Sequence, residues 1–191
     1  MPRTSFKTLS AKDRKAWRAW LSENHVTQKE VWLVFYKKHT GKPTVSYEDA
    51  VQEALCFGWI DSIVRRIDEE RYMQLFTPRK TGSNWSDLNK RRVKKLIAQG
   101  LMTEAGLRKV VEAKKDGSWR NLDTVEKLTV PADLSKALSG NKRAKDNFAG
   151  LSSSRKKAFL YWIGSAKTEG TRTKRIVETV RLLVEKKMPG M

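Results

Sequence analysis

The order of apolar and polar positions predicts mixed structure in the N-terminal half of the chain. Residues 10–24 carry apolar side chains at helical spacing after a Ser-x-x-Asp sequence at Ser10, which predicts an amphipathic helix opened by a capping box. The run VWLVFY at residues 31–36 is β-branched and aromatic, so it predicts a buried strand. A second Ser-x-x-Asp at Ser46 predicts a helix that ends at Gly58.

Two further β-type runs predict a hairpin. Residues 59–67 and 71–76 flank the polar residues 68–70, a length suited to a tight connection. With the strand at 31–36, this predicts a three-stranded antiparallel sheet packed with helices.

After Pro78 the pattern is helical. One helix is expected to begin at Ser83 or Ser86 and to end at Gly100, and the next to begin at Thr103. Residues 117–129 show no steady period, and short helices follow from Pro131 onward.

The fold class is therefore α+β and helix-rich, with a short helical bundle at the C-terminal end. We expect an α+β domain over residues 1–125 and a helical domain over residues 126–191.

Charge is the main feature of the composition. The 191 residues include 40 Lys and Arg against 21 Asp and Glu, a formal net charge of +19. From Pro131 onward, fourteen basic residues face five acidic ones, so the C-terminal third is the more basic part. Such an excess produces a positive surface potential, which favours anionic partners.

Other features narrow the class of protein. No run is apolar enough to cross a bilayer, and the first nine residues lack the apolar core of a signal peptide, so we expect a cytoplasmic protein without membrane insertion. The single Cys56 excludes an internal disulfide, and with only His25 and His39 beside it no metal site is expected.

The segment ALCFGWIDS at residues 54–62 concentrates chemical groups. Cys56 lies beside an apolar helix face, which favours an inert buried thiol. Asp61 shares the apolar side of its strand with Trp59 and Ile63, so it needs a partner. Two roles fit this position: a buried hydrogen bond within the protein, or binding of a ligand or transfer of a proton.

The loop after residue 78 suits an anion. Its polar and aromatic groups precede a helix N-terminus, where backbone N–H groups, the helix dipole and a guanidinium can converge on a phosphate or carboxylate. Plain helix capping is the alternative. The candidate ligand-binding residues are Trp59, Asp61, Arg79, Lys80, Ser83, Asn84 and Trp85.

Two predicted helices near the C-terminus begin with cations. Cations in a first turn oppose the helix dipole, which indicates that the charge serves another purpose, such as binding a polyanion. A solvated basic face is the alternative. The candidate residues are Arg155, Lys156, Lys157, Arg172, Lys174 and Arg175.

Several segments in order along the chain resemble one bacterial family, the YdeI or OmpD-associated (bacteriocin-protection, OmdA-like) proteins. They are ALCFGWIDS (54–62), FTPR (76–79), SNWSDLN (83–89), LMTEAGL (101–107), AKKDGSW (113–119), VPADLSKAL (130–138) and AKTEGTRTKRI (166–176). The resemblance implies a resistance-related role and a short helical C-terminal domain, and it carries over no catalytic residue.

Three functions stay open from the sequence. The first is a non-enzymatic, stress- or resistance-related binding protein for an anionic ligand, either a phosphate-bearing molecule or nucleic acid. The second is a small-molecule enzyme or sensor with a pocket near Trp59, Asp61 and Arg79. The third is a protein–protein adaptor that uses the C-terminal bundle. No catalytic residue, cofactor or metal is expected.

Overall fold

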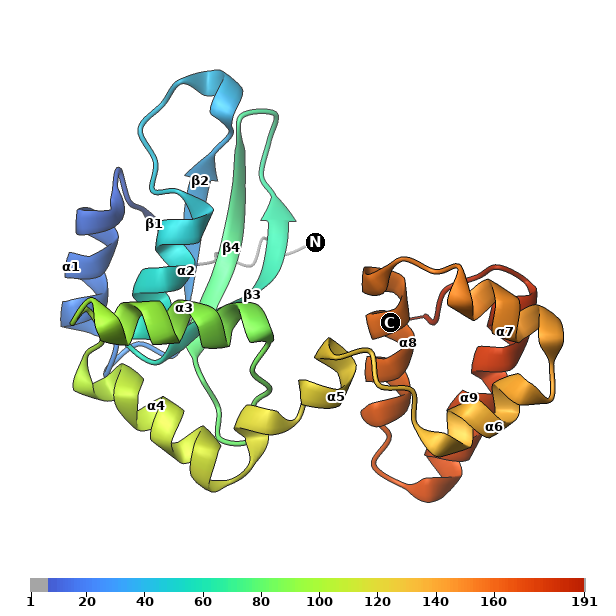
Figure 1. Ribbon diagram of the computed structural model, residues 1–191. Coiled ribbons are helices and arrows are strands. Elements are labelled where there is room, and N and C mark those ends of the chain that lie inside the picture. The colour runs from blue at the N-terminus through green and yellow to red at the C-terminus, as the bar shows by residue number, and fades with distance from the viewer. Residues whose placement is uncertain (1–6, 191) are drawn as a thin grey trace. The chain divides into compact units, whose positions relative to one another are not determined.

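The structure, a computed structural model, describes residues 7–190 in two compact units, of which one ends at Arg120 and the other begins at Asn121 (Figure 1). Each unit encloses a hydrophobic core of its own. Within the described residues, no helix combines the length and apolar character needed to span a membrane. The same residues contain no group of three or more His, Cys, Asp or Glu placed to hold a metal ion.

The first unit is built on a mixed sheet with the strand order β1-β2-β4-β3. The strands are β1 (Thr8–Ser10), β2 (Val31–Tyr36), β3 (Trp59–Arg66) and β4 (Arg71–Pro78). The strands β2, β4 and β3 pair antiparallel, whereas β1 pairs parallel with β2.

The prediction of three antiparallel strands is therefore wrong in detail, although the α+β class is confirmed. The additional strand β1 has only three residues, of which only Leu9 is partly buried. So short a strand cannot show the alternation that identifies a strand in sequence.

Helices cover one face of the sheet (Figure 1). There the apolar sides of α1 and α2 meet Leu33 and Phe35 of β2, while Trp32 and Val34 form a small cluster on the opposite face. The helices α3 and α4 pack against α2. The helical elements of this unit are α1 (Arg14–Asn24), η1 (Lys38–Thr40), α2 (Tyr47–Cys56), α3 (Asp87–Ala98), α4 (Glu104–Lys115) and η2 (Ser118–Arg120).

Helix starts follow the capping residues closely. Ser46 caps α2 by accepting the Asp49 N–H at 3.0 Å, and Ser86 and Thr103 cap α3 and α4, as predicted. The predicted start at Ser10 is wrong, because Ser10 belongs to β1 and Asp13 accepts the Ala16 N–H at 2.7 Å instead. Either residue could cap a helix, and pairing of Ser10 with β2 decides between them.

The second unit is a bundle arranged around its last helix. The helix α9 contacts α6, α7 and α8, and α5 contacts α8. Its core includes Phe148, Phe159 and Ile163, which lie in the short helices predicted after Pro131. The helices are α5 (Asp123–Glu126), α6 (Ala132–Ser139), α7 (Lys142–Ala149), α8 (Ser153–Gly164) and α9 (Glu169–Val184).

Candidate functional site

Asp61 is held by neutral hydrogen-bond donors. Its Oδ2 accepts from the Tyr47 hydroxyl at 2.8 Å and from Gln74 Nε2 at 2.7 Å. Burial, followed by the hydrogen bond to Asp61, raises the pKa of Tyr47 to about 12. Asp61 is thus a satisfied, half-buried carboxylate in the sheet.

The predicted alignment of Asp61 with Trp59 and Ile63 on an apolar face is wrong. Trp59 is buried, but Ile63 is 51% exposed. The register of β3 against β4 shifts between Asp61 and Val64, and such a bulge changes the face to which the following side chains point. Strict alternation along residues 59–67 therefore fails after Asp61.

Trp59 lies in the core. Its indole N–H donates to the His25 carbonyl at 3.2 Å, and its ring meets Trp20 edge-on. It lines a surface cleft with His25 and Phe57, whereas Arg79 lines a different cavity, and Asp61 lines neither. The expected pocket of Trp59, Asp61 and Arg79 is thus not formed as one of these cavities.

Arg79 is a buried cation, with 4% of its surface exposed. Its guanidinium carbon lies 3.6 Å from the centre of the Trp85 ring. One terminal nitrogen, Nη1, donates to the Asn84 carbonyl at 3.1 Å and to Ser83 Oγ at 3.5 Å. The buried Nε has no partner among the described residues, and no described carboxylate forms an ion pair with Arg79.

Burial changes the chemistry of this guanidinium. Loss of solvation lowers the pKa of Arg79 to about 10, and the charge of Asp61 opposes this effect. A buried charge is normally compensated by a partner of opposite sign. In this protein the compensation inside the described residues is limited to an aromatic face, two oxygen acceptors and the field of Asp61.

The cavity at Arg79 is small. It has about 10 Å³ of room for the centre of a water-sized sphere, enough for one water molecule or one anionic oxygen. Its wall includes Lys80, which is exposed. Two acids also line it, but Glu112 is paired with Lys109, and Asp116 accepts the Gly82 and Ser118 N–H groups. The hydrogen bonds from Ser118 hold the pKa of Asp116 below its usual value.

The loop around Arg79 leads into α3 through an aromatic pair. Trp85 is buried and its ring centre lies 4.9 Å from that of Trp119 in η2. The Asn84 side chain is exposed, and Ser83 is half-buried. The structure thus brings Arg79, Ser83 and Trp85 together, and the backbone carbonyl of Asn84 accepts a hydrogen bond from Arg79.

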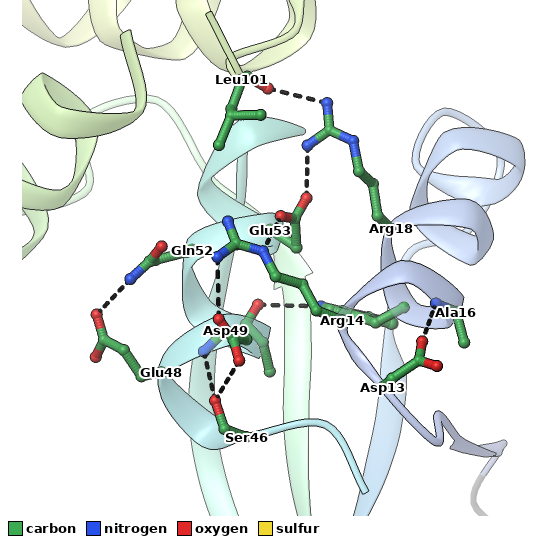
Figure 2. Close-up of polar contacts among 12 residues, drawn as sticks. Asp13, Arg14, Ala16, Arg18, Ser46, Glu48, Asp49, Gln52, Glu53 and Leu101 are labelled. Atoms are coloured by element: carbon green, nitrogen blue, oxygen red, sulfur yellow. Dashed lines mark hydrogen bonds and ion pairs between the residues drawn. The ribbon is translucent and has the colours of Figure 1, made fainter. Parts of the chain in front are cut away.

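A second charged centre, missed in the sequence, lies between α1 and α2 (Figure 2). Glu53 is 1% exposed, and its carboxylate accepts hydrogen bonds from Arg14 Nε and Arg18 Nη1, each at 2.6 Å. Arg18 also donates to the Leu101 carbonyl at 3.0 Å, and Arg14 reaches Asp49 at 3.0 Å. The available signal was Glu53 itself, a carboxylate set within the apolar positions 50–55 of a helix.

Most of the candidate polyanion-binding cations in the second unit are used internally. Lys157 pairs with Glu126 at 2.5 Å, and Arg172 forms two hydrogen bonds with Asp133. Arg175 stacks on Trp162 and donates to its carbonyl, while Lys156 donates to the Ala149 carbonyl. The remaining two, Arg155 and Lys174, are exposed, and their side chains form no hydrogen bond or ion pair within residues 7–190.

Comparison with known families gives two matches. Residues 9–109 match a family described as a domain of unknown function (DUF8412), and residues 127–186 match the family described as bacteriocin-protection, YdeI or OmpD-associated. The resemblance seen in the sequence is thereby confirmed over the second range. No curated protein and no solved structure matches the chain. Because the first match covers more than half of the 191 residues, the chain belongs to the DUF8412 family, and it carries a bacteriocin-protection, YdeI or OmpD-associated domain at residues 127–186.

Proposed function

We propose that this chain is a non-enzymatic, stress- or resistance-related binding protein that holds a small phosphate-type anion at Arg79. The observation that carries the proposal is the buried guanidinium without an ion-pair partner and with its Nε–H unsatisfied. The match to the bacteriocin-protection, YdeI or OmpD-associated family supports the resistance-related part of the proposal.

An anion at the mouth of the cavity would correct the imbalance at Arg79. One of its oxygens would accept the Nε–H in a charge-assisted hydrogen bond, the strongest kind available to a guanidinium. Its charge would also raise the pKa of Arg79 from about 10 toward the ordinary value. The stacking on Trp85 fixes the plane of the guanidinium and so defines the direction from which the anion must approach.

The size of the cavity favours a small anion over nucleic acid. A nucleic-acid site needs a row of cations along an open surface, whereas this cavity admits about one oxygen. The pairing of Lys157 and Arg172 with acids leaves less charge for a polyanion in the second unit. The enzyme alternative lacks support at Asp61, whose Oδ2 is engaged by Tyr47 and Gln74.

The test is a titration of the full chain with inorganic phosphate at constant ionic strength, followed by NMR of the arginine Nε–H resonances. We expect the Arg79 resonance to shift with saturation and sulfate to compete with phosphate. The wild-type measurement decides the proposal without any variant. An Arg79 resonance that does not move at about 20 mM phosphate, well above the concentration that fills a site of millimolar affinity, would contradict it.

Two variants assign the site. Arg79→Lys should weaken phosphate binding by about tenfold, because an ammonium group cannot both stack on Trp85 and donate in a fixed plane. Arg65→Lys is the matched control: Arg65 also lies over a tryptophan ring, that of Trp32, but it is exposed. Its phosphate affinity should equal that of the wild type. Equal loss in both variants would assign the effect to the replacement of arginine by lysine in general and not to the site at Arg79.

A further inference from the structure

A groove between α3 and α4 lies in the first unit, apart from the Arg79 cavity. Its volume is about 370 Å³, within the range of small-molecule sites. Val93 and Ile97 of α3 face Val110 of α4 across it, and Trp119 of η2 lies at one side. Ile97 is 47% exposed although it lies on the apolar side of its helix.

Local chain geometry opens this groove. The helix α3 ends at a turn in which Gly100 has a left-handed backbone (φ 67°), and α4 then begins at its cap Thr103. Beyond α4, a second left-handed glycine, Gly117 (φ 83°), turns the chain so that η2 brings Trp119 back against the pair. The groove is therefore built into the backbone of one continuous segment.

Cations surround the apolar floor. The groove lining contains four of them, Lys90, Arg91, Lys94 and Lys114, and no acidic residue. The ammonium groups of Lys90 and Lys114 lie 5.9 and 5.6 Å from the centre of the Trp119 ring. Lys90 also pairs with Asp87, which lies 3.5 Å away and does not line the groove. The groove thus combines an apolar interior with a rim of one sign of charge.

We propose that the α3–α4 groove binds a small anionic amphiphile, a molecule with an apolar body and one anionic head, such as a medium-chain carboxylate. The apolar body would cover the exposed side chain of Ile97 and the partly buried ring of Trp119, over a floor formed by the buried Val93 and Val110. The anionic head would meet the basic rim, so the complementarity of charge selects the sign of the ligand.

The shape of the groove supports a free amphiphile as its occupant. It is a concave space between two helices, and concave apolar sites with a few charged groups are typical of small-molecule ligands. A bilayer surface would instead require apolar side chains that project outward from a helix face. The groove is separate from the Arg79 cavity, and the contact between Trp85 and Trp119 lies between the two sets of lining residues.

The experiment titrates the full chain with decanoate below its micelle concentration and records the Trp119 indole N–H and the Val93, Ile97 and Val110 methyl resonances. We expect saturable shifts at these groups. Decyltrimethylammonium, which has the same chain and the opposite charge, should bind about tenfold more weakly or not at all. Absence of binding by decanoate, or equal binding of both compounds, overturns the proposal.

A pair of adjacent lysines provides matched variants. Lys94→Glu reverses a charge on the rim and should weaken decanoate binding by about tenfold. Lys95→Glu makes the same change on the same helix, but Lys95 is exposed and does not line the groove, so the affinity should be retained. Circular dichroism verifies that both variants are folded. An equal loss in both would assign the effect to net charge and overturn the proposal.

Two further arms separate the alternatives. Binding to anionic lipid vesicles without binding to free decanoate would place the site on a membrane surface and overturn the proposal of a free ligand. Inorganic phosphate should not displace decanoate, and Arg79→Lys should bind decanoate as the wild type does. Competition by phosphate would mean that both compounds bind one site, and it would overturn the proposal of a separate groove. Failure of phosphate to bind at Arg79 would contradict the proposed function and leave the decanoate result unaffected.

Discussion

Glu53 carries a negative charge inside the first unit, and two arginines from a neighbouring helix surround it. We expect Glu53→Gln to lower the free energy of unfolding by about 3 kcal/mol, at the low end for a broken buried pair, because both arginines are about one-third exposed and regain water. Urea unfolding measures the change. Glu70→Gln, which breaks the exposed pair with Lys42, is the control and should change stability little.

An unaltered stability in Glu53→Gln would mean that the two guanidiniums are held by their other acceptors alone. These are Asp49 for Arg14 and the Leu101 carbonyl for Arg18.

Cys56 is a buried thiol, as the sequence predicted. Burial, followed by the charge of Glu53, raises its pKa from 9.0 to about 11, although Arg18 opposes the change. The folded protein thus keeps this proton over a pH range in which the unfolded chain releases it. The contribution to stability is complete below about pH 9 and is lost as the pH rises toward 11, by at most ~1.4 kcal/mol per pH unit.

The measurement is urea unfolding of the wild type and of Cys56→Ala at about pH 8 and about pH 10. Stability should fall more steeply with pH in the wild type than in the variant, because the variant lacks the titrating thiol. Parallel pH dependences would refute the assignment. A thiol reagent should also label the native protein much more slowly than the urea-unfolded chain.

At the candidate site, the sequence groups residues that are neighbours in the fold, but it does not give their contacts. Arg79, Ser83 and Trp85, three of the candidates for binding an anion, lie together. The burial of Arg79 and its stacking on Trp85 depend on how the loop folds over α4, which no local pattern contains. Likewise, the donors that satisfy Asp61 come from Tyr47 and Gln74, both distant in the chain.

Helix α4 lies so close to the end of α2 that the contact leaves no room for a side chain at Gly106. A Cβ at Gly106 would lie 2.2 Å from the Cys56 carbonyl oxygen and 2.7 Å from that of Leu55. Both obstacles are backbone, so no side chain can move aside. We expect Gly106→Ala to destabilise the protein by about 3 kcal/mol, at the upper end of overpacking costs, measured by urea or thermal unfolding.

Gly164→Ala is the control for this prediction. Gly164 ends α8 with no atom within 4 Å of the added carbon, so alanine should be neutral or stabilise by about 0.5 kcal/mol through its helix propensity. If Gly106→Ala were equally harmless, α4 would have to lie farther from α2 than the structure places it.

Elements marked by strong local signals were predictable. The capping residues Ser46, Ser86 and Thr103 stand where the helices begin, and the run at Val31–Tyr36 is the strand β2. The failures are of a different kind, since they depend on pairing between strands. The parallel partner β1 and the bulge in β3 are set by neighbouring strands, and a single segment does not contain that information.

For the molecule as a whole, the net charge of +19 should set the response to salt. Self-repulsion of like charges destabilises a compact state, and salt screens it. We expect the midpoint of thermal unfolding to rise by a few degrees as sodium chloride increases from about 20 to about 200 mM. Sodium sulfate at equal ionic strength should raise it further if Arg79 binds such anions. A midpoint that falls with sodium chloride would mean that the ion pairs outweigh the repulsion.

The coarse architecture of the chain was accessible from sequence, since hydrophobic period and caps give the α+β class and the helical C-terminal part. The contacts of the individual charged side chains could not be predicted from the sequence. Lys157, Arg172 and Arg175 are candidates for binding a polyanion, and the fold places them against Glu126, Asp133 and the Trp162 carbonyl, contacts that the sequence does not indicate. The composition gives the number of charges, whereas the fold determines which charged side chains form internal contacts.

The strand order β1-β2-β4-β3 also has a consequence for synthesis. The strand made last, β4, holds the central place and joins β2 to β3. On the ribosome, the apolar strand β2 therefore lacks hydrogen-bond partners along one edge until Pro78 has emerged. The nascent hairpin of β3 and β4 closes locally and then docks as a unit, so we expect the ribosome-bound chain to acquire protease resistance only after that point.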